Sequence, residues 1–313
     1  MSGPPAAAHT PFQVAFGERS SRSSATLHVE LPVLGGLHRE TIFVDAEPAG
    51  EHGALTLHRA GHWLLGHAST AIDPRRGLEA ASLQLYRDLV AATHGWHLAR
   101  IWNYVPGINA PGPDQLENYR AFCRGRSLAF ESEFGGVFKR LLPAASAVGC
   151  DDDRLTVIFA AHERPVQHFE NPQQVPAYDY PPEHGPRPPS FARATVVAAA
   201  DAPTVFISGT AAIKGHATIA PDDTLAQLAC TLDNLSAISR VCGLGDDLAA
   251  GRAQARHVKI YLRRAADYAA VSRELAASLL RPGDQVSYLR SDICRAALNV
   301  EIEATIVGAA LAR

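Results

Sequence analysis

Alternating apolar and polar positions mark much of the first half of the chain as short strands. Such alternation is typical of strands with one buried face, and the Gly- and His-rich breaks between runs indicate antiparallel hairpins. Residues 77–95 and 113–126 instead place apolar residues at helical spacing, which predicts two helices. The expected strands are residues 25–33, 40–47, 54–60, 62–69, 96–105 and 154–161.

The same order of elements returns in the second half of the chain. Helices are expected at 222–243, with Asp222 as the N-cap, and at 265–280. Between the halves, residues 171–189 are so rich in proline that neither a helix nor a central strand fits, which predicts an extended connection. The expected strands here are residues 192–199, 204–213, 257–263, 285–293 and 298–307.

This repeated order predicts an α+β protein of two related domains, each a mixed β-sheet with helices packed on one face. We expect an N-terminal domain at residues 1–175 and a proline-rich connection at residues 176–190. The C-terminal domain then covers residues 191–313.

Composition and charge indicate which partners, location and cysteine chemistry to expect. Hydrophobic residues make up 47% and charged residues 19%, and the net charge of -3 gives no support for a nucleic-acid partner. No apolar run reaches bilayer length, and the N-terminus lacks a basic region followed by an apolar one, so a cytoplasmic location is expected. The five cysteines are scattered without CxxC pairs, which favours reduced thiols over disulfides or a zinc site.

The first candidate for chemistry is a pair of glutamates near the C-terminus. Glu301 and Glu303 lie two residues apart in a predicted strand, so they point to the same face. A solvated charged face is the ordinary interpretation. The alternative is that burial or the neighbouring carboxylate raises the pKa of one carboxyl, which then acts as a general acid.

Four motifs occur together with this order of elements: ARIWNYVPGIN (99–109), NYRAFCRGR (118–126), ISGTAAIKGH (207–216) and YLRSDICRAALNVEIEA (288–304). The combination resembles the chorismatase family, whose members cleave pyruvate from chorismate and contain two RidA (YjgF)-like domains. The resemblance covers nearly the whole chain. It implies that chorismate, a small molecule, is the substrate and that neither a metal nor an organic cofactor is needed. With both domains in one chain, a monomer is expected.

The resemblance also implies roles for single residues. Glu301 matches the glutamate that protonates the methylene carbon of the enolpyruvyl ether. Cys294 and Gly209 match two positions associated with the choice of product, and they point to the branches that make 3-hydroxybenzoate, alone or with 4-hydroxybenzoate. The alternatives are hydrolysis of chorismate to a dihydroxycyclohexadiene carboxylate and a RidA-like imine hydrolase. By composition alone, Cys294 reads as a small buried hydrophobic residue.

The two carboxylates of chorismate call for fixed cations, and the planar fork of arginine suits a carboxylate. Together with the family resemblance, this favours Arg126 and Arg263 as substrate-binding residues, with Arg120 and Arg295 as secondary candidates. Arg126 is expected to reach Glu301 across the domain junction, where small-molecule sites are common.

Tyr104 and Tyr119 are candidate hydrogen-bond donors to a substrate carboxylate. Each tyrosine fits amphipathic packing at the end of a strand or helix equally well. Both interpretations stay open at this stage.

Overall fold

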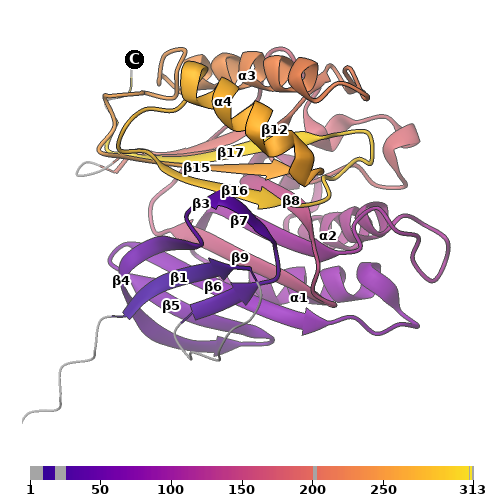
Figure 1. Ribbon diagram of the computed structural model, residues 1–313. Coiled ribbons are helices and arrows are strands. Elements are labelled where there is room, and N and C mark those ends of the chain that lie inside the picture. Colours follow the sequence, from indigo (N-terminus) through magenta and orange to yellow (C-terminus); the bar gives the residue numbers. More distant parts are fainter. Residues whose placement is uncertain (1–9, 18–25, 200–202, 310, 312–313) are drawn as a thin grey trace, which may run out of the picture.

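The computed structural model describes residues 10–17, 26–199, 203–309 and 311. They form two large sheets that pack face to face, with two helices on the outer side of each sheet (Figure 1). The helices are α1 (Gly77–Ala92) and α2 (Asn118–Phe134) on one side, and α3 (Thr224–Val241) and α4 (Tyr268–Ser278) on the other. The predicted α+β class, with helices on one face of each sheet, is confirmed.

The first sheet has eight strands in the order β2-β1-β4-β5-β6-β9-β7-β8. Consecutive strands β4, β5, β6 and β9 pair antiparallel, whereas β7 and β8 pair parallel. The bounds are β1 Thr10–Phe16, β2 Thr26–Val29, β4 Arg39–His52, β5 Leu55–Ala60, β6 Trp63–Ala71, β7 His97–Pro106, β8 Ala144–Cys150 and β9 Arg154–His162.

The second sheet has seven strands in the order β10-β11-β12-β17-β15-β16-β3. One edge strand, β3, comes from the N-terminal part of the chain and pairs antiparallel with β16. The bounds are β3 Val33–Gly36, β10 Gln167–Phe169, β11 Ala194–Val197, β12 Thr204–Ala211, β15 Ala255–Leu262, β16 Gln285–Arg290 and β17 Val300–Val307. The short pair β13 (Ile213–Lys214) and β14 (Ala217–Thr218) follows β12.

Large apolar cores fill the spaces between these layers. One lies between α1, α2 and the first sheet, and another between α3, α4 and the second sheet. A third fills the space between the two sheets and includes Trp102, Tyr104, Phe206 and Tyr261. Because strand side chains alternate, the inter-sheet face of β17 belongs to its odd-numbered residues.

Several predicted boundaries are wrong. The helix α2 starts at Asn118, because residues 113–116 form turns and bends, and it runs on to Phe134. Asp223, not Asp222, is the N-cap of α3, and its side chain accepts a hydrogen bond from the Ala226 backbone N at 3.0 Å. Strands β1, β8, β10 and β14 were not predicted, and β3 overlaps the predicted strands only at Val33.

The proline-rich stretch packs along the junction of the two halves. It contains the short 3₁₀ helices η2 (Ala177–Asp179) and η3 (Pro182–His184), and Tyr180 between them is buried. Further 3₁₀ helices are η1 (Gly135–Leu141) and η4 (Ala265–Asp267).

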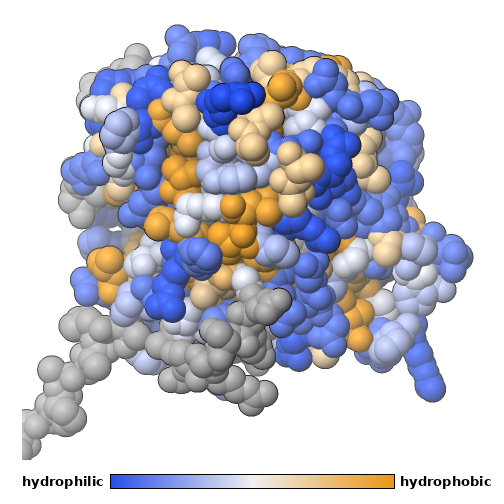
Figure 2. Space-filling model, in the orientation of Figure 1, coloured by the Kyte–Doolittle hydropathy of each residue, from blue (hydrophilic) through white to orange (hydrophobic). Residues whose placement is uncertain are grey.

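Within the described ranges, no helix combines the length and the apolar character needed to span a bilayer. Most of the face shown in Figure 2 is hydrophilic, and apolar residues gather between α4 and the N-terminal strands.

Candidate active site

A cavity of about 430 Å³ opens where the two halves and the proline-rich connection meet. Its volume suits a small organic ligand. The β12–β17 side of the second sheet, the α2 segment and the connection all contribute walls. The lining includes Glu117, Tyr119, Arg120, Tyr180, His184, Arg193, Gly209, His216, Cys294, Arg295 and Glu301.

Glu301 reaches this cavity from the inter-sheet face of β17. Its strand neighbours in register are Ala211 of β12 and Tyr261 of β15. The residue is only 3% exposed, and its Oε1 has no hydrogen-bond partner among the described residues. A buried carboxyl without a donor to stabilise its charge favours the protonated form.

Burial raises the pKa of Glu301 to about 8, and the negative charge of Glu303 adds to the effect. Arg100 and Arg193 act in the opposite direction without cancelling it. Glu301 is therefore mostly a neutral acid at pH 7, which is the state that a general acid requires.

Glu303 has the opposite character, although it points to the same face. Its Oε2 lies 2.7 Å from Arg100 Nη2, and its Oε1 lies 2.9 Å from Lys259 Nζ. The Trp102 indole Nε1 also donates to Oε1 at 2.9 Å. Burial alone would raise the pKa of Glu303, but the two cations outweigh it and hold that pKa below its ordinary value. A solvated charged face is therefore excluded for this pair, since Glu303 is only 2% exposed.

Gly209 makes room for the Glu301 carboxyl. It lies where the pairing of β12 with β17 shifts register between Ile207 and Thr210, as in a β-bulge. A methyl group at position 209 would lie 2.0 Å from Glu301 Oε1 and 2.7 Å from Glu301 Cδ. A side chain here is compatible with the fold only if the Glu301 carboxyl moves.

Cys294 and Tyr119 lie on the wall beside Glu301. Cys294 is partly buried, and burial together with the nearby Glu301 raises the pKa of its thiol to about 12, so it stays a neutral thiol. Burial and the neighbouring Cys123 and Cys294 raise the pKa of Tyr119 well above its ordinary value. Both groups therefore present neutral side chains to a ligand.

Two arginines flank Tyr180 at the cavity. Arg193 Nη2 donates to the Tyr180 hydroxyl at 2.8 Å, and the Arg295 guanidinium lies 5.2 Å from the centre of the Tyr180 ring. Arg295 also donates to the His216 carbonyl oxygen at 2.8 Å. Arg295 was a secondary candidate from its sequence, and Arg193 was not predicted. The available signal for Arg193 was a charged residue directly before the fully buried strand β11.

Three predicted site residues do not line the cavity. Arg126 is buried under the rings of Tyr86 and Phe130, and its Nε and Nη2 lack hydrogen-bond partners among the described residues. That Arg126 reaches the site containing Glu301 stays a prediction. Tyr104 lies in the core between the sheets.

Arg263 is the third of these residues, and it organises the loop before β17. Its Nε donates to Leu298 O at 2.7 Å, and its Nη1 pairs with Asp292 Oδ1 at 2.7 Å. Its Nη2 is shared among the Asn109 side chain and two loop carbonyls.

The mouth of the cavity carries a cluster of Glu183, His184 and His216, whose facing N and O atoms lie 3.0–3.6 Å apart. Burial lowers the pKa of His184, and the charges of Arg295 and Arg120 lower it further. These arginine charges oppose a bound cation and favour an anionic ligand.

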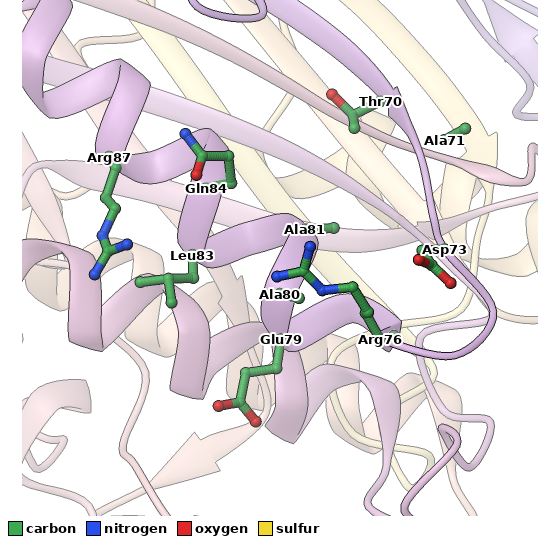
Figure 3. A pocket seen from close by; sticks show the side chains of 11 residues that line it. Thr70, Ala71, Asp73, Arg76, Glu79, Ala80, Ala81, Leu83, Gln84 and Arg87 are labelled. Carbon is green, nitrogen blue, oxygen red and sulfur yellow. The ribbon is translucent and has the colours of Figure 1, made fainter.

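Another hollow of about 510 Å³ lies over α1 and contains none of the predicted site residues. Figure 3 shows its charged side chains, among them Arg76, Glu79 and Arg87, spread along the helix and the loop before it. Arg76 and Arg87 are exposed, and Glu79 is half-buried. The cavity at Glu301 is therefore the better candidate for chemistry.

Comparison with known proteins places this geometry in a family. The profile described as "Chorismatase FkbO/Hyg5-like, N-terminal" matches residues 43–161. A chorismatase from Streptomyces rapamycinicus is 37% identical over 265 residues, covering 82% of this chain and 78% of that protein. A 3-hydroxybenzoate synthase from Streptomyces hygroscopicus is 37% identical over 219 residues, covering 66% of this chain and 63% of that protein.

A solved structure agrees with the sequence matches. The crystal structure of a chorismatase superposes with a TM-score of 0.78 at 30% identity, covering 97% of this chain and 95% of that chain. Its match spans both sheets and the connection between them, because nearly the entire length is aligned. The chain therefore belongs to the chorismatase family.

Proposed function

We propose that this protein converts chorismate to pyruvate and a hydroxybenzoate, with Glu301 as the proton donor. The observation that carries the proposal is a buried carboxyl, neutral at pH 7, in a cavity flanked by Arg193 and Arg295. Family membership supplies the substrate, and the relative named 3-hydroxybenzoate synthase supports the 3-hydroxy product.

The chemistry follows from the state of Glu301. Its proton passes to the methylene carbon of the enolpyruvyl ether and leaves an oxocarbenium-like centre. Cleavage of the bond between the ring carbon and the ether oxygen then releases pyruvate. Loss of the ring proton from the neighbouring carbinol carbon then gives the 4-hydroxy product. The 3-hydroxy product requires in addition that the hydroxyl oxygen of that carbon bonds to the carbon that the ether oxygen leaves, and that its bond to the carbinol carbon then breaks. Either route releases one proton, which restores the Glu301 acid. A carboxyl with a pKa near the working pH suits both steps.

Arg193 and Arg295 are proposed to bind the substrate carboxylates. Arg126 does not line the cavity, and it is proposed as a further candidate because its buried Nε and Nη2 have no hydrogen-bond partner among the described residues. Tyr119 is proposed as a neutral hydrogen-bond donor beside the substrate carboxylates. Arg263 and Tyr104 are proposed to act by supporting the walls rather than by touching substrate, since neither lines the cavity.

Replacing Arg295 tests carboxylate binding. Arg295→Gln is expected to raise KM for chorismate about tenfold to a hundredfold, because a hydrogen bond to a charged group contributes about 1.5–3 kcal/mol. Steady-state kinetics measure the change. Arg264→Gln is the control, since Arg264 is exposed and pairs with Asp267. Equal KM values for Arg295→Gln and the parent protein would remove Arg295 from the binding site.

Replacing Cys294 tests product choice. Cys294→Ala is expected to change the ratio of hydroxybenzoate to dihydroxycyclohexadiene carboxylate, because the thiol lies beside Glu301 at the cavity wall. Chromatography of the products measures the ratio. Cys230→Ala, which removes another partly buried thiol, should leave it unchanged. The same product profile in Cys294→Ala and the parent would exclude the thiol from this choice.

We also propose a monomeric, cytoplasmic enzyme. The two sheets of one chain already cover each other's inner faces. Five free cysteines are consistent with a reducing compartment.

The direct test of the function is to incubate the purified protein with chorismate. We expect pyruvate and hydroxybenzoate in equal amounts, and almost none from Glu301→Gln. Dihydroxycyclohexadiene carboxylate in place of hydroxybenzoate would favour the hydrolytic alternative. No pyruvate from the intact protein would refute the proposal.

A further inference from the structure

A chain of ion pairs runs through the interior between the two sheets and ends beside Glu301. At its outer end, His257 Nδ1 lies 2.8 Å from Glu40 Oε1, at the rim of a second cavity. Glu40 Oε2 lies 2.6 Å from Lys259 Nζ, and the same ammonium lies 2.9 Å from Glu303 Oε1. The Glu303 carboxylate then pairs with Arg100 at 2.7 Å.

These groups come from both halves of the molecule. Glu40 and Arg100 belong to β4 and β7 of the first sheet, whereas Lys259 and Glu303 face each other across β15 and β17 of the second sheet. The side chains of all four are at most 4% exposed. Bulk water therefore screens their charges little.

The chain connects to the cavity through Arg100. Its Nη2 donates to the Ser146 hydroxyl at 3.0 Å, and its Nη1 donates at 3.3 Å to the carbonyl oxygen of Ile207, which lies two residues before Gly209 in β12. Ser146 Cβ and the Glu301 carboxyl are both neighbours of Gly209. Glu301 is thus the next carboxyl after this chain of ion pairs, and it has no ion-pair partner of its own among the described residues.

The charges of Arg100, Lys259, Glu40 and Glu303 bear on the protonation of Glu301. Arg100 and Lys259 supply two positive charges, and Glu40 and Glu303 supply two negative ones, so the four groups balance when His257 at the outer end is neutral. A charge on Glu301 would make the cluster net negative inside the protein, which is unfavourable at low dielectric.

We propose that Glu40, Lys259 and Arg100 are positioning residues for proton donation: they hold Glu303 as a carboxylate, and the balanced cluster keeps the adjacent Glu301 protonated. The inference rests on the proposed role of Glu301 as the acid. It assigns a part in the reaction to Glu40, more than 250 positions away in sequence.

Other charged and titratable groups also face Glu301 and Glu303 and influence the pKa values of both. Burial lowers the pKa of Lys259, but the negative charges of Glu303 and Glu40 outweigh burial and hold that pKa above its ordinary value. Glu40 has a pKa held well below its ordinary value, since Lys259 and His257 outweigh burial. The groups that act on Glu301 or Glu303 are Arg100, Arg193, Lys259, Glu40, Cys294, Tyr104 and Tyr261.

The test is an infrared titration of the protonated carboxyl, whose C=O stretch is assigned to Glu301 by its loss in Glu301→Gln. Glu40→Gln leaves one uncompensated positive charge, so the midpoint of the Glu301 titration should fall by about one unit. Turnover of chorismate at pH 8 should then fall about fivefold, with less loss in acid. The double variant Glu40→Gln/Lys259→Met restores the charge balance and should return the midpoint towards that of the parent.

Two further variants complete the design. Glu303→Gln should lower the midpoint of the Glu301 titration more than Glu40→Gln does, because it removes the nearest negative charge. This variant tests the inference if the double variant does not fold. Asp284→Asn is the control, since Asp284 forms a buried ion pair with Arg256 outside this chain of contacts.

The outcomes separate the two ideas. A midpoint unchanged in both Glu40→Gln and Glu303→Gln would overturn the inference, and so would a double variant shifted as far as Glu40→Gln alone. Shifted midpoints without turnover of chorismate by the parent protein would support the cluster and refute the proposed function. Turnover of chorismate by the parent protein with unshifted midpoints would support the proposed function and refute the role of the cluster.

Discussion

Glu301→Gln is expected to lower turnover of chorismate by about 10²–10⁴, the usual contribution of general acid catalysis. Glutamine keeps the shape of the protonated side chain but has no acidic proton to give to the methylene carbon. KM should change little, because the Arg193 and Arg295 side chains stay in place. Single-turnover measurement of pyruvate gives the change in rate.

The same variant has a built-in control for folding. The carboxyl has a pKa of about 8 in the folded protein and 4.5 as its ordinary value, so the folded state binds more protons between these limits. Stability of the parent protein is therefore lost as pH rises from 4.5 to 8, by up to about 1.4 kcal/mol per unit. Glu301→Gln removes that loss and should melt no lower than the parent at pH 8. A low-melting variant would mean that lost activity reports unfolding.

Gly209→Ala is expected to reduce turnover about ten- to a hundredfold and to change the product ratio. The added methyl would overlap the Glu301 carboxyl at 2.0 Å, so this carboxyl must move. A displacement near 1 Å between reacting groups typically costs about two orders of magnitude in rate. Kinetics and product chromatography on the same samples measure both effects.

Gly136→Ala is a matched control for this change. A methyl at position 136 would meet nothing within 4 Å, so neither rate nor product should respond. Parent-like kinetics in Gly209→Ala would show that the carboxyl position is less critical than the contact distances imply.

Local patterns predicted most of the strands and all four helices, because alternation and helical spacing are strong where one face is buried. Strand β8 was missed since its sequence, AASAVGC, consists of small residues and does not alternate. It is held by parallel pairing to β7 and by burial on both faces, which no local window contains. The edge strand β3 likewise owes its place to pairing with β16, far along the chain.

The candidate site, too, was only partly predictable from the sequence. Glu301, Cys294 and Gly209 could be identified because they lie in short motifs that carry the family resemblance. Gly209 lies in ISGTAAIKGH, and the other two lie in YLRSDICRAALNVEIEA. Arg193 was missed, because only the three-dimensional path of the proline-rich connection brings it to Tyr180. The family resemblance singled out Glu301 as the acid, but the lowered pKa of Glu303 was not predicted, since it depends on Arg100 and Lys259 from distant strands.

The pH dependence of kcat for chorismate, measured by pyruvate release, tests the central claim that a protonated Glu301 is the acid. Because the active form is the neutral carboxyl, kcat should be level around pH 6–7 and fall as pH rises through about 8, in step with the pKa of this group. A kcat that rises through the same range would mean that the reaction needs the ionised carboxylate, and it would contradict the account.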